Sequence, residues 1–214
     1  MISINKKSTY ALSPQKKVGI FDYPFTLNPF IGCQMQYKYC FVPGLVIKST
    51  RKDFFEKVQI KENIVDLLKK ELNKYSNLPQ HLKRVQFGVT TEIFQPKVIN
   101  YMKKNLGRGL IAELLDVFQT EWHEDNKWML HILTKNHNVT PYIDQLKNMR
   151  GMVQVEFSFI HHDEIISRKY EAYTSSITKR LNAITQLSNK DIFVRVMAMP
   201  FYGNDKDVKT LKDI

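Results

Sequence analysis

Apolar residues follow two alternating spacings along most of the chain. Three segments have the 3.6-residue spacing of amphipathic helices: 63–76, 108–119 and 176–187. Short apolar runs that are typical of buried strands lie between and beside them: 84–90, 128–133, 152–158 and 192–197. A further short helix is expected at 140–149. Strands that alternate with helices in this way predict right-handed βαβ units, and therefore an α/β protein with a mostly parallel sheet.

The pattern leaves the shape of the sheet open between a doubly wound sheet and a (βα) barrel. In both architectures functional residues collect at the carboxyl ends of the parallel strands. Polar residues follow several of the predicted strands, and a first strand is expected to lead into Cys33. A last helix begins near 207 and the chain stops at 214 in mid-pattern, so we expect a partial, C-terminally truncated barrel.

Composition predicts one globular domain that covers residues 1–214. Hydrophobic residues make up 43% and charged residues 25% of the chain, which are ordinary values for a globular protein. No apolar run approaches the roughly 20 residues that span a bilayer, and the first residues lack the apolar core of a secretory signal. Two cysteines are too few for a disulfide framework. We therefore expect a cytoplasmic protein without a membrane partner.

The formal net charge of +11 admits two interpretations. A basic surface attracts the phosphates of nucleic acid through the release of counterions. Lysines on exposed helix faces also serve simply to keep a protein soluble. Charge alone does not decide between a nucleic-acid partner and a solubilising surface.

One loop carries the residues with the most distinctive chemistry. The segment 28–43 begins Asn-Pro-Phe-Ile-Gly and then places Cys33, Tyr37 and Cys40 at intervals of four and three residues, with Phe41 after the last cysteine. It resembles the C-x3-C-x2-C cluster loop of the radical S-adenosylmethionine (SAM) superfamily, with Tyr37 in the place of the middle cysteine. Its flanks are similar to those of the branch that contains spore photoproduct lyase and the DNA-photolyase-like proteins.

Further residues typical of this branch recur in order after the loop. They are Thr91-Glu92 with Gln95-Pro96, Thr134-Lys135-Asn136, Ser158, Glu171, Arg180-Leu181 and Arg195. The resemblance thus extends through nearly the whole chain, with residues 1–27 as a lead-in and 28–43 as the cluster-type loop. It implies a partial barrel of the radical SAM type.

The resemblance also implies cofactors and their ligands. Cys33 and Cys40 become ligands of a [4Fe–4S] cluster, because soft thiolates suit iron–sulfur clusters, and Tyr37 stands at the third ligand position. Residues expected to contact SAM are Thr91, Glu92, Lys135, Ser158, Tyr39 and Arg195. The implied reaction is reductive cleavage of SAM to a 5′-deoxyadenosyl radical that acts on an unknown substrate, such as nucleic acid. A reducing protein such as flavodoxin or ferredoxin is then the expected partner.

Each of these residues also has a purely structural interpretation. Thr91 and Glu92 can cap the turn that follows them, Lys135 can be a solvated charge, and Ser158 can be a turn residue at the end of a strand. The run from His161 to Glu164 contains possible metal ligands. Because adjacent residues of an extended chain point in opposite directions, it is predicted to be a solvated polar loop.

Tyr37 conflicts with the cluster that the resemblance implies. A phenol has a pKa of about 10, is a harder donor than a thiolate and reaches farther from the backbone. The sequence contains no third cysteine. Two hypotheses follow: a radical SAM-type enzyme or a degenerate relative of one, or a non-catalytic basic βα-barrel protein that has lost the cluster and binds nucleic acid or a protein partner.

Overall fold

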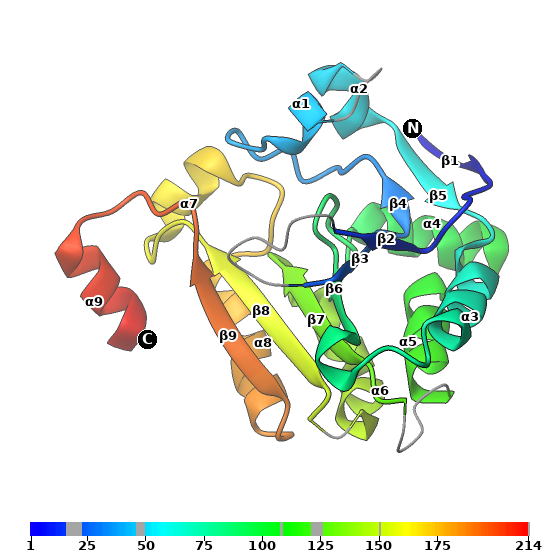
Figure 1. Cartoon of the computed structure of the whole chain (residues 1–214). Coiled ribbons are helices and arrows are strands. Elements are labelled where there is room, and N and C mark those ends of the chain that lie inside the picture. The colour runs from blue at the N-terminus through cyan, green and yellow to red at the C-terminus, as the bar shows by residue number, and fades with distance from the viewer. Residues whose placement is uncertain (16–22, 46–49, 108, 121–125, 150, 214) are drawn as a thin grey trace.

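The computed structural model describes residues 1–15, 23–45, 50–107, 109–120, 126–149 and 151–213. Within these ranges the strands form two sheets (Figure 1). The larger sheet has six strands in the order β2-β3-β6-β7-β8-β9, and all neighbours are parallel except β2 and β3. Its strands are β2 (Leu12–Pro14), β3 (Phe25–Leu27), β6 (Arg84–Phe87), β7 (Met129–Thr134), β8 (Val153–Phe159) and β9 (Phe193–Ala198).

The predicted α/β class and the mostly parallel sheet are confirmed. Each predicted strand is present with its ends shifted by one to three residues. The two outermost strands of the large sheet, β2 and β9, do not pair with each other in the described part of the chain. The six strands therefore form an open sheet, as the expected partial barrel requires.

Amphipathic helices cover the sheet where the apolar spacing predicts them. They are α3 (Ile64–Lys74), α5 (Leu110–Thr120) and α8 (Ile177–Ser188). In α3 the buried residues Ile64, Leu68 and Leu72 recur every four positions and form one stripe. Residue 108, at the predicted start of the second helix, lies outside the described residues.

The predicted helix at 140–149 is two elements. A 3-10 helix, η2 (His137–Tyr142), leads into α6 (Ile143–Asn148). Pro141 has no N–H to donate and is tolerated only in the first turn of an α-helix, so the regular α-helical pattern begins after it. The last helix, α9 (Asp205–Asp213), begins two residues before its predicted start, and residue 214 lies outside the described part.

Several short helices were not predicted from the apolar spacing. They are α1 (Val42–Leu45), α2 (Arg51–Glu56), η1 (Gln80–Leu82), α4 (Pro96–Leu106) and α7 (Glu164–Tyr170). Two of these have clear end signals in the sequence. Pro96 opens α4 and Gly107, at φ 61°, closes it, while the Asp163 side chain accepts hydrogen bonds from the amides of Ile165 and Ile166 at the start of α7.

The strand expected before Cys33 is divided between the two sheets. β3 belongs to the large sheet, whereas β4 (Phe30–Ile31) pairs with β5 (Val58–Lys61) in a three-stranded sheet that also contains β1 (Ile2–Lys6). Gly32 then turns the chain toward Cys33 at φ +92°. A Cβ atom at Gly32 would lie 2.1 Å from the carbonyl oxygen of Lys57, so only glycine fits this crossing.

The core lies between the large sheet and the helices. All seven residues of β8 are buried, as are six residues of α5. By contrast β9 has no buried residue, and its free edge pairs with no other strand among the described residues. Within the described ranges no helix is both long enough and apolar enough to cross a bilayer.

Candidate functional site

A cavity of about 590 Å³ lies at the carboxyl ends of β6 to β9. The cluster-type loop forms one of its walls, and the chain from Met199 to Tyr202 forms another. Predicted site residues that line the cavity are Cys33, Tyr37, Tyr39, Cys40, Thr91, Glu92, Lys135 and Ser158. The structure therefore gathers into one place residues that are up to 125 positions apart in the sequence, from Cys33 to Ser158.

The cluster-type loop is held by contacts that its own sequence does not reveal. The guanidinium of Arg51 donates hydrogen bonds to the carbonyls of Tyr37, Lys38 and Cys40 at 2.8–2.9 Å. The amide of Cys33 donates to the carbonyl of Phe54 at 2.9 Å. Both partners come from α2, so this helix fixes the shape of the loop. The loop hydrogen-bonding role of Arg51 was not predicted, because it depends on contacts that are distant in the sequence.

Lys135 lies at the centre of a buried ionic network. Its ammonium is 2.8 Å from Glu171 Oε1 and donates a hydrogen bond to the hydroxyl of Ser158. Glu171 Oε2 in turn pairs with Arg180 at 2.8 Å, and Tyr39 donates its phenol proton to Glu171 Oε1. Glu171 and Arg180 are completely buried. These two residues, which the family resemblance singled out without a role, hold Lys135 at the floor of the cavity.

Burial shapes the protonation of this network. Burial works to raise the pKa of Glu171, but the neighbouring charges of Lys135 and Arg180 outweigh it, so the pKa is lowered and the carboxylate is ionised. Burial lowers the pKa of Lys135, while Glu171 opposes that change. The pKa of Glu92 is raised, chiefly by burial. Charge at the floor of the cavity is therefore dominated by Lys135, Arg180 and ionised Glu171.

Thr91 and Glu92 are both engaged in local structure. The hydroxyl of Thr91 donates to the carbonyl of Gly32 at 2.8 Å and also accepts from the side chain of Gln95. Glu92 accepts hydrogen bonds from Thr134 and from the amides of Lys135 and Phe94. These bonds tie the loop after β6 to the cluster-type loop and to the end of β7. Contact of Thr91 and Glu92 with SAM stays a prediction.

Tyr37 and Tyr39 place their rings against the ammonium of Lys135. The ring centroids of the two tyrosines are 5.7 Å apart and their planes differ by 18°. The Lys135 ammonium lies 5.5 Å from the centroid of Tyr37 and 5.7 Å from that of Tyr39, within the range of a cation–π contact. Tyr37 therefore contacts the network at the floor of the cavity.

Arg195 lies apart from the other predicted site residues. It is not among the residues that line the cavity, and its guanidinium is 3.6 Å from Glu156 Oε1. The other oxygen of Glu156 lies 2.7 Å from His131 Nε2, in an orientation that does not meet hydrogen-bond geometry. The ring of Tyr23 stacks on His131 at 4.7 Å. Arg195, whose side chain is about half exposed, thus lies beside a polar group on one face of the sheet, and its predicted contact with SAM is untested.

The run from His161 to Glu164 was expected to be a solvated polar loop, and this expectation is wrong for His161. His161 is buried, and its ring stacks on that of His162 at 4.4 Å instead of pointing away from it. The chain bends here because Glu164 begins α7, so the alternation of an extended strand does not apply. Both histidines face Asp207 of α9, at 3.6 Å and 3.8 Å. His161 Nδ1 accepts a hydrogen bond from the amide of Asp163, which in neutral histidine leaves the proton on Nε2, the atom that faces Asp207.

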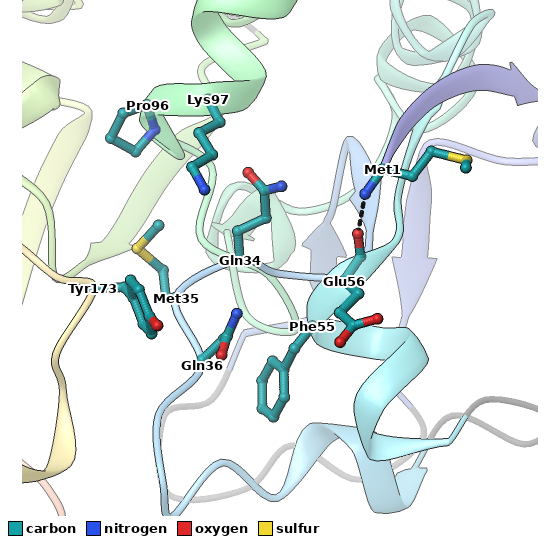
Figure 2. Close-up of a pocket in the computed structure, with 9 residues that line it drawn as sticks. All are labelled: Met1, Gln34, Met35, Gln36, Phe55, Glu56, Pro96, Lys97 and Tyr173. Carbon is teal, nitrogen blue, oxygen red and sulfur yellow. Dashed lines mark hydrogen bonds between the residues drawn. The ribbon is translucent and has the colours of Figure 1, made fainter.

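A second cavity, of about 440 Å³, lies beside the cluster-type loop (Figure 2). Gln34, Met35 and Gln36 of the loop line it, and Lys97 of α4 points toward Gln34. The N-terminal ammonium donates a hydrogen bond to the carbonyl of Glu56 at its edge. None of the predicted site residues lines this second cavity.

The residues of the loop do not fit a [4Fe–4S] cluster. Burial raises the pKa of Cys33 to about 12, and the pKa of Cys40 is raised as well, so both sulfurs are protonated thiols. The pKa of Tyr37 is also raised, chiefly by burial, and its ring is occupied by contacts with Tyr39 and Lys135. Metal binding would ionise the two thiols, but the sequence offers no third one.

The chain has a distant sequence relative among known proteins. No family model matches the chain. An uncharacterised protein of Methanocaldococcus jannaschii, MJ0683, is 23% identical over 190 residues, which are 88% of this chain and 63% of that protein.

Solved structures with a similar fold include several of spore photoproduct lyase. A cysteine variant of that enzyme has a TM-score of 0.73 at 15% identity and matches 99% of this chain and 56% of its own. Another variant, solved with bound SAM and a dinucleoside spore photoproduct, has a TM-score of 0.68 at 14% identity and matches 99% and 55%. The enzyme anSMEcpe with bound SAM has a TM-score of 0.50 at 12% identity and matches 80% and 41%.

The chain thus spans about half of the length of the solved structures that it matches. The likeness in fold covers nearly the whole of this chain, including its open, mostly parallel sheet. The protein has the fold of the radical SAM enzymes, in the form found in spore photoproduct lyase.

Proposed function

We propose that the cavity binds SAM and that Tyr37 prevents the chain from holding an intact [4Fe–4S] cluster. On this proposal the protein is a degenerate relative of the radical SAM enzymes that keeps the SAM site. The support for SAM comes from the site itself and from the solved structures of the same fold that contain SAM. Reductive cleavage of SAM is not part of this proposal, because the residues of this chain do not fit the cluster that would supply the electron.

The observation that carries the proposal is the buried ammonium of Lys135, which lines the cavity and is paired with Glu171. The carboxylate of a ligand would pair with this ammonium in a region of low dielectric. The volume of about 590 Å³ lies within the range of small-molecule sites.

Lys135 is the residue best placed to bind a ligand carboxylate. An ammonium group has three N–H donors, and two of them are used by Ser158 and Glu171. Lys135 also lines the cavity, so its ammonium can meet the carboxylate of a ligand bound there. Ser158 itself lines the cavity, so its hydroxyl can serve the same ligand group. If SAM binds, it brings a sulfonium centre and a methionine chain to these residues.

Binding measured on iron-free protein tests the proposal. Isothermal titration with SAM should show one saturable site, and Lys135→Met should weaken it at least tenfold because the carboxylate loses its ionic partner. The matched control is Lys190→Met, because Lys190 is exposed beyond α8 and does not line the cavity; its affinity should equal that of the unmodified protein. Absence of saturable binding, or equal affinity in the Lys135→Met protein, would contradict the proposal.

A second candidate function, nucleic-acid binding, is favoured by the mouth of the cavity. Tyr170 and Tyr202 stack there at 4.5 Å with their planes 2° apart, and Tyr202 lines the cavity. Lys38 and Lys169 lie over the ring of Tyr170 at 6.0 Å and 5.7 Å. Aromatic rings beside lysines form a surface on which bases stack and phosphates pair. This second proposal needs no cluster, and a reducing protein partner has no role in either proposal.

A further inference from the structure

Tyr37 and Tyr39 offer the cavity two neutral aromatic faces. Their rings are nearly parallel and close together, and both line the cavity. A phenol is neutral at neutral pH, so neither ring carries a charge. The Tyr39 hydroxyl donates a hydrogen bond to the carboxylate of Glu171, which makes the ring richer in electrons.

The two faces already accept a cation. The ammonium of Lys135 lies 5.5 Å from one centroid and 5.7 Å from the other. A cation within about 6 Å of a ring centroid is attracted by the quadrupole of the ring, and the attraction grows when water is excluded. Lys135 and Tyr37 both line the cavity, so a ligand held by Lys135 lies close to the ring of Tyr37. A cysteine at position 37 would remove half of this aromatic surface.

We propose that Tyr37, at the position of the missing cluster cysteine, recognises the positively charged sulfonium of SAM and so makes the site discriminate SAM from S-adenosylhomocysteine. This role of Tyr37 rests on the proposed SAM site. The two nucleosides differ by one methyl group and one positive charge, and they share the carboxylate that Lys135 is proposed to bind. Discrimination between them therefore reports on what contacts the sulfur.

On this proposal Tyr37 contributes to the binding of SAM, besides preventing the cluster. In the family the cluster would supply the anchor for SAM, and this chain lacks the third thiolate that such a cluster needs. Cation–π contact with Tyr37 and Tyr39 replaces part of the anchoring by an interaction that needs no metal. S-adenosylhomocysteine, whose sulfur carries no charge, gains nothing from this cation–π contact.

Affinities for the two nucleosides in three proteins test this. Iron-free protein should bind SAM about 2- to 30-fold more tightly than S-adenosylhomocysteine. Tyr37→Phe keeps the ring and should keep the ratio, whereas Tyr37→Leu removes the ring and should lower the ratio. If the leucine variant does not fold, as judged by circular dichroism, Tyr37→Met serves as the ringless protein.

The outcomes separate the two proposals. A ratio that is unchanged in the ringless variants overturns the role of Tyr37 and leaves the SAM site standing. Equal binding of both nucleosides to the unmodified protein does the same. Absence of binding to either nucleoside overturns the SAM site and the role of Tyr37 together. A ratio that falls only when the ring is removed supports both.

Discussion

Residue 37 decides what the loop between Cys33 and Cys40 can hold. Two thiols and a buried phenol leave two irons of a four-iron cluster without protein ligands. Tyr37→Cys should therefore raise the iron retained after anaerobic reconstitution from well below four to about four atoms per chain. Iron and sulfide assays after gel filtration measure this, together with the visible absorption of the cluster.

The control for that variant is Tyr37→Ser, which removes the ring without adding a thiolate. It should retain no more iron than the unmodified protein, because removing the ring makes space in the loop but adds no ligand for iron. Four irons retained by the unmodified chain would show that a ligand from elsewhere completes the set, and Tyr37 would then not be the residue that prevents cluster binding.

Cys33 should be an unreactive thiol in the folded protein. At pH 8 a thiol with a pKa of about 12 is roughly a thousandfold less ionised than an ordinary one with a pKa near 9, and the thiolate is the nucleophile. Iodoacetamide should therefore modify Cys33 at least a hundredfold more slowly in native protein than in urea, while Cys40, which is only partly buried, reacts first. Peptide mass spectrometry distinguishes the two sites; rapid native labelling of Cys33 would contradict its burial.

The same thiol makes a pH-dependent contribution to stability. Its folded pKa is raised above the unfolded value, so the neutral form is favoured by folding. The contribution is complete below about pH 9 and is lost as pH rises from 9 toward 12. Cys33→Ser should remove this part of the alkaline loss of stability in urea unfolding between pH 8 and pH 10.

Sequence reasoning located most of the residues of the site but not what holds them. Strand ends and the family resemblance placed Lys135 and Ser158 together with Cys33, because carboxyl ends of parallel strands meet at one edge. The hydrogen bonds that Arg51 donates to the loop, and the bond that Gln95 accepts from the amide of Gln34, were not predicted, since their partners lie in other parts of the chain and no sequence spacing indicates them. Arg195 follows the same strand pattern, yet it faces Glu156 and not the cavity.

Among the elements, the crossing at Gly32 fixes the path from β4 into the cluster-type loop. Gly32→Ala should destabilise the protein by roughly 3 kcal/mol or more, because it strains a backbone at φ +92° and drives a Cβ atom into the carbonyl of Lys57. Guanidinium unfolding measures the change. Gly44→Ala in α1 is the matched control, since nothing lies within 4 Å of its Cβ position, and it should be neutral or slightly stabilising. Equal stability of the two variants would contradict the tight crossing.

Elements with a clear apolar period of their own were predictable, whereas others, such as α4 with only two buried residues, were not. Strands β6 to β9 and helices α3, α5 and α8 carry their period within their own residues, so pattern alone places them. The sheet of β1, β5 and β4 is built from strands of five, four and two residues whose partners are far apart in the sequence. Such pairings are settled by tertiary contacts, which a local pattern does not contain.

At the scale of the molecule, the charge of +11 predicts how nucleic acid would bind. Fluorescence anisotropy with a single-stranded oligonucleotide should give a log affinity that falls linearly with log salt, because phosphate contacts release counterions. Lys38→Met and Lys169→Met should each reduce the slope by about 0.7, since both lysines flank the stacked tyrosines at the mouth of the cavity. Lys190→Met, away from the mouth, should leave the slope unchanged. Absence of binding at low salt would leave these lysines as solubilising charges only.

The exposed strand β9 has a consequence for handling the protein. Its free edge presents unpaired amide and carbonyl groups in the described structure, and its apolar side chains Phe193 and Val196 are 58% and 47% exposed. An uncovered edge of this kind is a template on which a second chain can add its own strand. Arg195 is the charged residue on this strand, and it opposes such pairing as a gatekeeper. At high concentration we therefore expect these 214 residues to aggregate by edge-to-edge strand pairing that begins at β9. An increase in light scattering with concentration would show this.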